Sequence, residues 1–198
     1  MRNLLKDFLS QGRRLEEIDR QEGHFGIKEG RIVFKIARSL NDFSVVVEIG
    51  AYKGKSTCFI AEGLKGSSSR LYCVDTWFND GGMRQPRTDT FPDFLRNISA
   101  WNDKIVPLRG FSADIRKTWP LERKIDFLWI DGDHAYTGVK KDIEDWLPLV
   151  RDGCFVCFHD YREYPGVKRA VDEKIFEGKL RLVETKGNVL LAKKPTTS

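Results

Sequence analysis

The sequence predicts an α/β protein built on one doubly wound, mostly parallel sheet with a C-terminal antiparallel hairpin strand. Strand-like apolar runs alternate with segments of helical periodicity along most of the chain. Several runs end in an acidic residue, at the edge where parallel sheets usually bind ligands. The last two runs flank Lys186-Gly187-Asn188, which is typical of a hairpin turn.

Residues 1–43 are expected to form a helical N-terminal extension. Apolar side chains recur at helical spacing over residues 3–20, and a second helix turns Ile32, Val33 and Ile36 inward. His24 lies in the loop between the two helices. The first helix would either cover a binding site or pair two subunits into a homodimer, and its pattern fits both.

Strand and helix patterns alternate after residue 43. Apolar and β-branched runs predict parallel strands at 45–49, 71–74, 105–108, 125–130 and 154–158, and hairpin strands at 180–183 and 189–192. Helical spacing predicts helices at 56–64, 139–150 and 166–176, and one after Thr90, where Asp93 completes a capping box and Leu95 faces inward. Residues 76–100 include a long polar connection, which predicts a lid or substrate-binding insertion.

The composition fits one globular domain spanning residues 1–198. Hydrophobic residues make up 40% and charged residues 32%, and no apolar run approaches the roughly 18 residues of a membrane span. The N-terminus lacks the features of a signal peptide, so we expect a cytoplasmic protein with no membrane partner. The net charge of +5 comes without a nucleic-acid motif, so no nucleic-acid partner is expected.

Cys154 and Cys157 form a CxxC pattern inside an apolar run. Residues three apart on a strand point to opposite faces, and no second CxxC is available to complete a zinc site. We therefore expect buried thiols, not a redox or zinc pair.

A glycine turn after the first strand predicts a nucleotide-type cofactor site. The strand leads into Gly50, and Gly54-Lys55-Ser56 opens the next helix. The dinucleotide fingerprint GxGxxG is absent, because its middle glycine is missing. The turn is also one residue short of the P-loop pattern GxxxxGK[ST], which changes the set of amides that converge on a phosphate.

Acidic side chains at the first two strand ends favour a cationic cofactor. Glu48 precedes the turn, where it would repel a pyrophosphate and attract an ammonium or sulfonium group. Asp75 ends the second strand, at a position from which an acidic residue can hold ribose hydroxyls. Both features suit S-adenosyl-L-methionine, and a P-loop-like phosphotransferase or NTPase remains the alternative.

Five segments at predicted strand ends form one ordered pattern. They are Glu48-Ile49-Gly50-x-x-x-Gly54-x-Ser56-Thr57, Val74-Asp75-Thr76-Trp77, Gly110-Phe111-Ser112, Asp131-Gly132-Asp133-His134-x-Tyr136 and Phe158-His159-Asp160. With this pattern the sequence resembles the class I S-adenosylmethionine-dependent methyltransferases, and within them the bacterial small-molecule and sugar O-methyltransferases of the macrocin type. The resemblance implies a Rossmann-like methyltransferase fold.

The resemblance also implies cofactor-binding roles. Gly50 and Gly54 would let the methionine part lie close to the backbone, and Asp75 would hold the ribose. Trp77 would flank the adenine or pack the loop, and Ser112 would flank the adenine or cap a helix. The expected cofactor-binding residues are Glu48, Gly50, Ala51, Gly54, Ser56, Asp75, Thr76, Trp77, Ser112 and Asp131.

Two clusters of histidine and aspartate are expected to carry the chemistry. Both follow strand ends that should meet in one crevice, and methylation of a hydroxyl needs a base or a metal to activate the acceptor. The expected catalytic residues are His134 as general base and Asp131 beside it. The expected metal ligands are Asp131, His159 and Asp160, for Mg²⁺ or Mn²⁺ if a metal is bound.

The sequence thus predicts an S-adenosylmethionine-dependent O-methyltransferase that acts on a hydroxyl of a small molecule, with sugars among the candidates. A non-catalytic protein that binds the same cofactor is the other alternative. The (N/D)PP(Y/F) signature that accompanies methylation of nucleobase amino groups is absent after the fourth strand.

Overall fold

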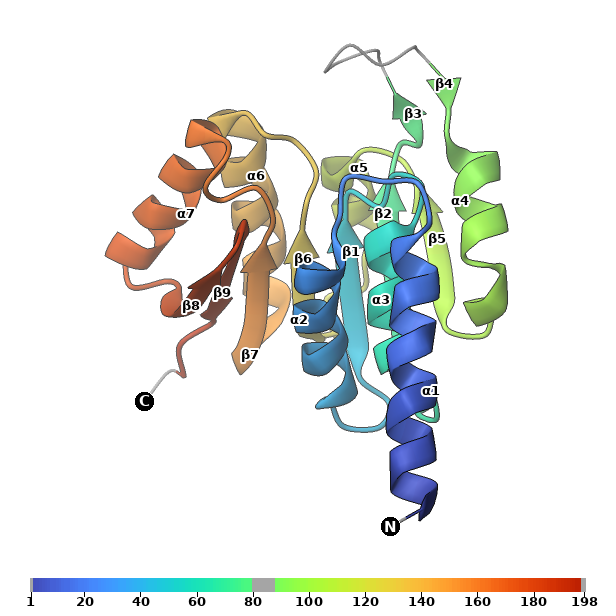
Figure 1. Ribbon diagram of the computed structural model, residues 1–198. Helices are drawn as coiled ribbons and strands as arrows, with labels where there is room; N and C mark the ends of the chain where they lie inside the picture. Colours follow the sequence, from blue (N-terminus) through green and yellow to red (C-terminus); the bar gives the residue numbers. More distant parts are fainter. Residues whose placement is uncertain (1, 80–87, 197–198) are drawn as a thin grey trace.

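The computed structural model describes residues 2–79 and 88–196, with the side chains of residues 2–10 left out. A seven-stranded sheet of order β5-β2-β1-β6-β7-β9-β8 forms its centre (Figure 1). The parallel strands are β1 (Val45–Ile49), β2 (Arg70–Asp75), β5 (Ile105–Arg109), β6 (Ile125–Ile130) and β7 (Val150–Phe158). β9 (Val189–Lys193) runs antiparallel between β7 and the edge strand β8 (Arg181–Lys186), which confirms the predicted sheet and hairpin.

Helices cover both faces of the sheet (Figure 1). One face carries α1 (Arg2–Asp19), α2 (Ile27–Arg38), α3 (Lys55–Gly63) and α4 (Phe91–Asn97), and the other carries α5 (Ser112–Thr118), α6 (Tyr136–Trp146) and α7 (Pro165–Phe176). Val46 packs in the first core and Val47 in the second, as expected for a strand buried on both sides. α2 packs along α3, so this part of the N-terminal segment belongs to the helical layer.

The boundary between α6 and β7 differs from the prediction. The helix expected to reach residue 150 ends at Trp146, because Pro148 lacks the N–H that a continuing helix needs. A 3₁₀ turn at Leu147–Leu149 follows, and β7 begins at Val150. Along β7 the two cysteines face opposite cores as free thiols; Cys157 is buried, as predicted, whereas Cys154 is half-buried.

Part of the predicted insertion 76–100 lies outside the described residues, namely residues 80–87. Around them, β3 (Phe78–Asn79) pairs with β4 (Thr88–Asp89). α4 and the following turn at Ser99–Trp101 bury three side chains in the core, those of Phe94, Ile98 and Trp101. The role of residues 76–100 as a lid or substrate-binding insertion therefore stays a prediction.

Two details of α4 were predicted wrongly. Thr90 occupies the N-cap position, but its hydroxyl donates to the carbonyl of Trp77, so the capping box does not form. Leu95, expected to face inward, is exposed. Across residues 2–79 and 88–196, every helix is too short or too polar to cross a membrane.

Candidate active site

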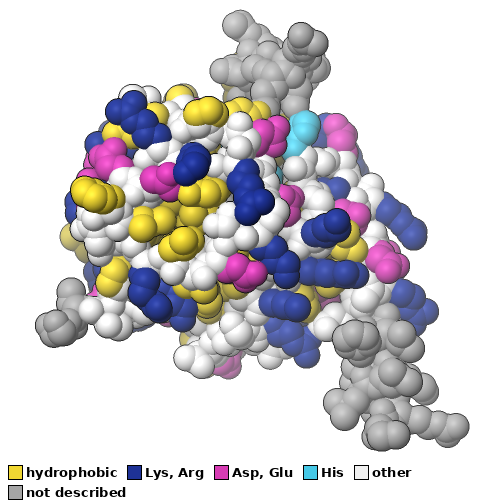
Figure 2. All heavy atoms as spheres, turned by 60° about the vertical axis from the view of Figure 1, so that its left-hand side comes forward, with side chains coloured by type: hydrophobic (Ala, Val, Ile, Leu, Met, Phe, Trp, Pro, Cys, Tyr) yellow, Lys and Arg dark blue, Asp and Glu magenta, His cyan; other side chains and the backbone are white. Residues whose placement is uncertain are grey.

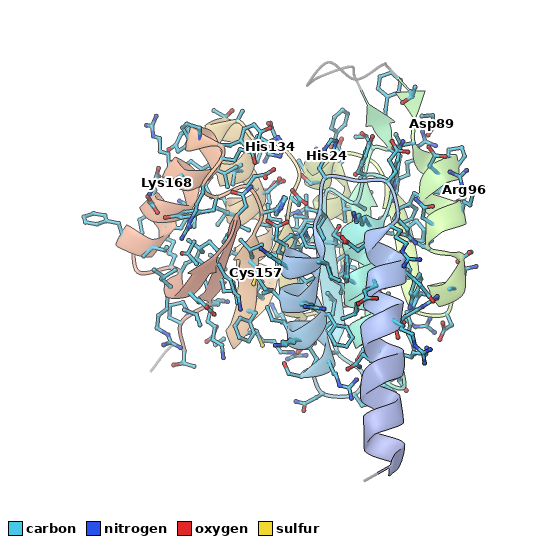
Figure 3. All side chains as sticks on the ribbon, in the orientation of Figure 1. His24, Asp89, Arg96, His134, Cys157 and Lys168 are labelled. Carbon is cyan, nitrogen blue, oxygen red and sulfur yellow. The ribbon has the colours of Figure 1, made fainter. Side chains whose placement is uncertain are left out.

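The carboxyl ends of β1, β2, β6 and β7 meet at one edge of the sheet. Backbone hydrogen bonds continue the ladders beyond the strands, from Gly50 N–H to the carbonyl of Val74 and from Asp131 N–H to that of Ile49. His134 and His24 lie at this edge, whereas Cys157 lies in the body of the molecule (Figure 3). Figure 2 shows a histidine reaching the surface there beside acidic side chains. The strand-end residues therefore converge as predicted.

The glycine turn binds a carboxylate of its own chain. Asp75 Oδ2 accepts the backbone N–H groups of Ala51 and Tyr52, both at 2.8 Å, and Asp75 Oδ1 accepts that of Trp77 at 2.6 Å. A phosphate would have to displace this carboxylate, so the geometry does not favour the P-loop alternative. A carboxylate has about four acceptor positions, which leaves Asp75 room for a ribose hydroxyl.

The two glycines of the turn are required by the protein itself. Gly50 has φ +84°, and a Cβ added there would lie 2.1 Å from the carbonyl oxygen of Asp131. Gly54 has φ +85°, and a Cβ there would lie 2.9 Å from Ile98. The turn thus needs glycine because neighbouring backbone and side chains crowd it, before any cofactor approaches.

Glu48 lies beneath the turn, fully buried against α3. Its carboxylate accepts hydrogen bonds from Ser56 Oγ at 2.5 Å and Thr57 Oγ1 at 2.6 Å, and from the Cys73 thiol at 3.3 Å. Burial raises the pKa of Glu48 to about 7, against the lowering effect of these bonds. Glu48 has no exposed surface, and the buried Ser56 commits its hydroxyl to Glu48, so both support the turn from behind.

The buried carboxyl of Glu48 should give the protein a measurable pH dependence. Its folded pKa of about 7 exceeds its ordinary value of 4.5, so its contribution to stability is complete below pH 4.5 and is lost as pH rises through 7. Glu48→Gln removes this loss. We expect the variant to gain about 2–4 kcal/mol relative to the native protein between pH 4.5 and 8. Urea unfolding at several pH values measures this, and a stability difference that stays constant with pH would contradict it.

The side chain of Trp77 packs the loop, the second of its two predicted roles. It is 1% exposed, and its ring centroid lies 4.8 Å from that of Phe91 and 4.6 Å from that of Phe94. The neighbouring Thr76 accepts the N–H of Phe78 through its hydroxyl oxygen at 3.2 Å. The Trp77 ring is therefore not free to flank an adenine.

Ser112 begins α5, with its hydroxyl donating to Asp142 of α6. Burial raises the pKa of Asp142 to about 6, although the bond from Ser112 opposes this. Phe111, next to Ser112, is 71% exposed at the same edge of the sheet. A contact between this segment and an adenine stays a prediction.

His134 and Asp160 form a hydrogen-bonded pair between the ends of β6 and β7. His134 Nε2 lies 2.8 Å from Asp160 Oδ2, and the imidazole stacks on Tyr164 with centroids 4.2 Å apart and planes 16° apart. The hydrogen bond to Asp160 raises the pKa of His134. Tyr164 thus covers one face of the His134 ring and Asp160 holds one edge, while part of the side chain remains exposed.

His159 is enclosed by three carboxylates. Its Nδ1 lies 3.1 Å from Asp131 Oδ1 and 3.3 Å from Asp160 Oδ1, and its Nε2 lies 3.3 Å from Glu29 Oε2. Burial lowers the pKa of His159, but the charge of Asp131 and the surrounding hydrogen bonds outweigh it and raise the pKa to about 12. Because each ring nitrogen of His159 already faces a carboxylate, this geometry disfavours His159 as a metal ligand.

A different trio could hold a cation. One ligand atom from each of Asp131, His134 and Asp160 lies within 4.8 Å of the others. His134 thus takes the place that the sequence reasoning gave to His159. Two carboxylates and an imidazole suit Mn²⁺ or another transition ion better than Mg²⁺.

Sequence reasoning missed two residues that reach the site from distant segments. Glu29 comes from the first turn of α2, where an acid three residues after Gly26 is typical of an ordinary helix start. Asn188 comes from the β8–β9 turn, where asparagine is a common turn residue. Tyr136, the last residue of the fourth segment of the pattern, packs against α7 and donates to Glu173 at 2.5 Å.

A family model described as "Methyltransferase domain" matches residues 47–161, more than half of the chain. The chain belongs to this family, and its fold is that of the class I methyltransferases. Two curated relatives match part of it. Uncharacterized protein y4gI of Sinorhizobium fredii is 30% identical over 58% of this chain, and uncharacterized protein R132 of Acanthamoeba polyphaga mimivirus is 28% identical over 64%. The chain spans only 13% and 57% of their respective lengths.

Solved O-methyltransferases share the fold. An O-methyltransferase from Bacillus cereus, in complex with SAH, superposes with a TM-score of 0.68 at 18% identity over 91% of this chain and 90% of its own. TomG from Streptomyces achromogenes, an O-methyltransferase involved in tomaymycin synthesis and solved with SAM, gives 0.67 at 17% identity over 94% and 88%.

Proposed function

We propose that this chain transfers a methyl group from S-adenosyl-L-methionine to a hydroxyl of a small molecule, with sugars among the candidate acceptors and His134 as general base. The observation that carries the proposal is the His134–Asp160 pair, 2.8 Å apart at the strand ends that follow the glycine turn. The bound cofactor would supply an electrophilic methyl group.

The residues of the crevice suit this cofactor. Its ammonium and sulfonium groups carry positive charge, and the strand ends bring Asp75 and Asp131 to the same edge of the sheet. Asp75 retains an acceptor position for a ribose hydroxyl while it holds the turn. The Asp75 carboxylate on the turn's own amides also argues against a phosphate ligand.

His134 would take the proton of the acceptor hydroxyl. An alcohol is a weak nucleophile at neutral pH, and a positioned base removes its proton as the methyl group is transferred. With Nε2–H donated to Asp160, the lone pair of His134 lies on Nδ1, which is the atom that receives the proton. Asp160 would then stabilise the imidazolium, as the carboxylate does in other His–Asp pairs.

A divalent cation such as Mg²⁺ or Mn²⁺ is a second way to activate the hydroxyl, and the convergence of Asp131, His134 and Asp160 favours this alternative. The two roles of His134 exclude each other, because a neutral imidazole has one nitrogen lone pair, which either takes up the proton or binds the metal. If His134 acts as the base, the protein should be active without added metal. If a cation activates the hydroxyl, a chelator should abolish activity.

A methylation screen tests the proposal. The protein is incubated with S-adenosyl-L-methionine carrying a deuterated methyl group and a panel of hydroxylated small molecules, with and without EDTA, and products are read by mass spectrometry. We expect a methyl ether that forms equally in EDTA. Loss of product in EDTA and recovery with Mn²⁺ would show that a metal ion, and not His134 as a base, activates the acceptor hydroxyl. Methyl groups found only on nitrogen or carbon would contradict the proposal.

A further inference from the structure

Asn188 links the C-terminal hairpin to the candidate catalytic pair. It lies in the turn between β8 and β9, and its side chain enters the turn that follows β7. Its Nδ2 donates to Asp160 Oδ1 at 2.6 Å. Its Oδ1 accepts the backbone N–H groups of Arg162 at 3.0 Å and Glu163 at 3.2 Å, and its own carbonyl accepts the N–H of Tyr161 at 3.1 Å.

These contacts fix both oxygens of the Asp160 carboxylate. Oδ1 accepts from Asn188 and Oδ2 faces Nε2 of His134, so rotation of the carboxylate would break both bonds. The backbone of Asp160 has φ +57°, a conformation that non-glycine residues adopt at a cost of roughly 1–2 kcal/mol. The backbone N–H groups of the next three residues donate to Asn188 and hold the chain in this turn.

We propose that Asn188 is a positioning residue that orients Asp160, and through it the ring of His134. The inference rests on the proposed function of His134 as a base. Without the Asn188 amide, Asp160 Oδ1 keeps, among the residues that the structure describes, only its contact with the neighbouring His159, and the carboxylate is free to turn away from His134.

Only an amide can serve at this position. Its oxygen must accept from two backbone N–H groups, and its nitrogen donates to Asp160 and, at 3.1 Å, to Glu163 Oε2. This pattern of donors and acceptors also fixes which way the amide points. An aspartate would still accept from the backbone but would face two carboxylates without a proton to share.

Two substitutions distinguish a role of Asn188 in orienting Asp160 from a role in closing the turn after β7. Asn188→Asp keeps the acceptor that closes the turn and removes the donor to Asp160. Asn188→Ala removes both and introduces no new charge. If Asn188 only closes the turn, the aspartate variant keeps the contact between His134 and Asp160 despite its added charge. If it positions Asp160, both variants release the His134 ring.

Nitrogen-15 NMR of the histidine rings gives the readout, because the chain has three histidines and each can be assigned by its own glutamine substitution. We expect the ring signals of His134 to move toward those of a free imidazole in both variants, while those of His24 stay within line width. Thermal unfolding and titration with S-adenosylhomocysteine verify folding, and we expect the affinity to change less than about threefold. If Asn188→Ala fails to fold, the aspartate variant alone decides.

Unchanged His134 signals in a folded variant would overturn the inference, and so would a shift in the alanine variant alone. The measurement needs neither an acceptor nor turnover. Failure of the methylation screen and failure of this inference are therefore separate results.

Discussion

Gly50→Ala is expected to destabilise the protein by about 2–5 kcal/mol and to abolish binding of S-adenosylhomocysteine. The left-handed backbone at φ +84° costs an alanine roughly 1–2 kcal/mol. In addition, the new Cβ would lie 2.1 Å from the Asp131 carbonyl oxygen, within rigid backbone that has no flexible end to move. Relief of this clash would push β1 and β6 apart at the edge that carries the site, at a further cost of about 1–3 kcal/mol.

Gly66 provides a matched control. It has nearly the same backbone conformation, φ +82°, and an added Cβ meets no atom within 4 Å. Gly66→Ala should therefore cost only the conformational part, roughly 1–2 kcal/mol, and leave cofactor binding intact. Urea unfolding of both variants measures the difference. Equal losses of stability would show that the Asp131 contact does not constrain the turn.

His134→Gln is expected to reduce methyl transfer by about 10²–10⁴-fold while the affinity for S-adenosylhomocysteine stays near the native value. Glutamine keeps a polar side chain of similar reach but cannot take up a proton at neutral pH. Because His134 contacts Asp160 and Tyr164 beyond the ends of β6 and β7, we expect its loss to act on turnover and not on cofactor binding. Steady-state rates on an acceptor found in the methylation screen, together with calorimetry, measure both effects.

His24→Gln is the control for loss of a histidine at the same edge of the sheet. The His24 ring centroid lies 5.9 Å from that of Tyr52, and the ring has no place in the proposed mechanism. We expect near-native rates for this variant. Near-native rates for His134→Gln would contradict the role of His134 as general base.

Much of the fold and part of the site follow from local sequence patterns. Acidic residues at successive strand ends predicted a shared crevice, because parallel strands that neighbour one another place their carboxyl ends together. Asp75, Asp131, His134 and Asp160 accordingly lie at one edge of the sheet. Family membership then confirmed the methyltransferase fold that the five ordered segments predicted.

The remaining details depend on side-chain direction and on contacts between distant segments. Glu48 was predicted to face the cofactor, but alternate residues of a strand point to opposite faces, and its side chain points under α3. His159 and Asp160 are adjacent in sequence, yet His159 turns toward Glu29 and Asp160 toward His134. The contact between Asn188 and Asp160 joins residues 28 positions apart, so no periodic pattern in the sequence predicts it.

Calorimetric titration with S-adenosylhomocysteine, in parallel with ATP and Mg²⁺, tests the central claim most directly. The claim is that the turn at Gly50, with Asp75 on its amides, binds a sulfonium-type cofactor and not a phosphate. We predict saturable one-to-one binding of S-adenosylhomocysteine and no heat of binding with ATP and Mg²⁺. Binding of ATP alone would contradict the account.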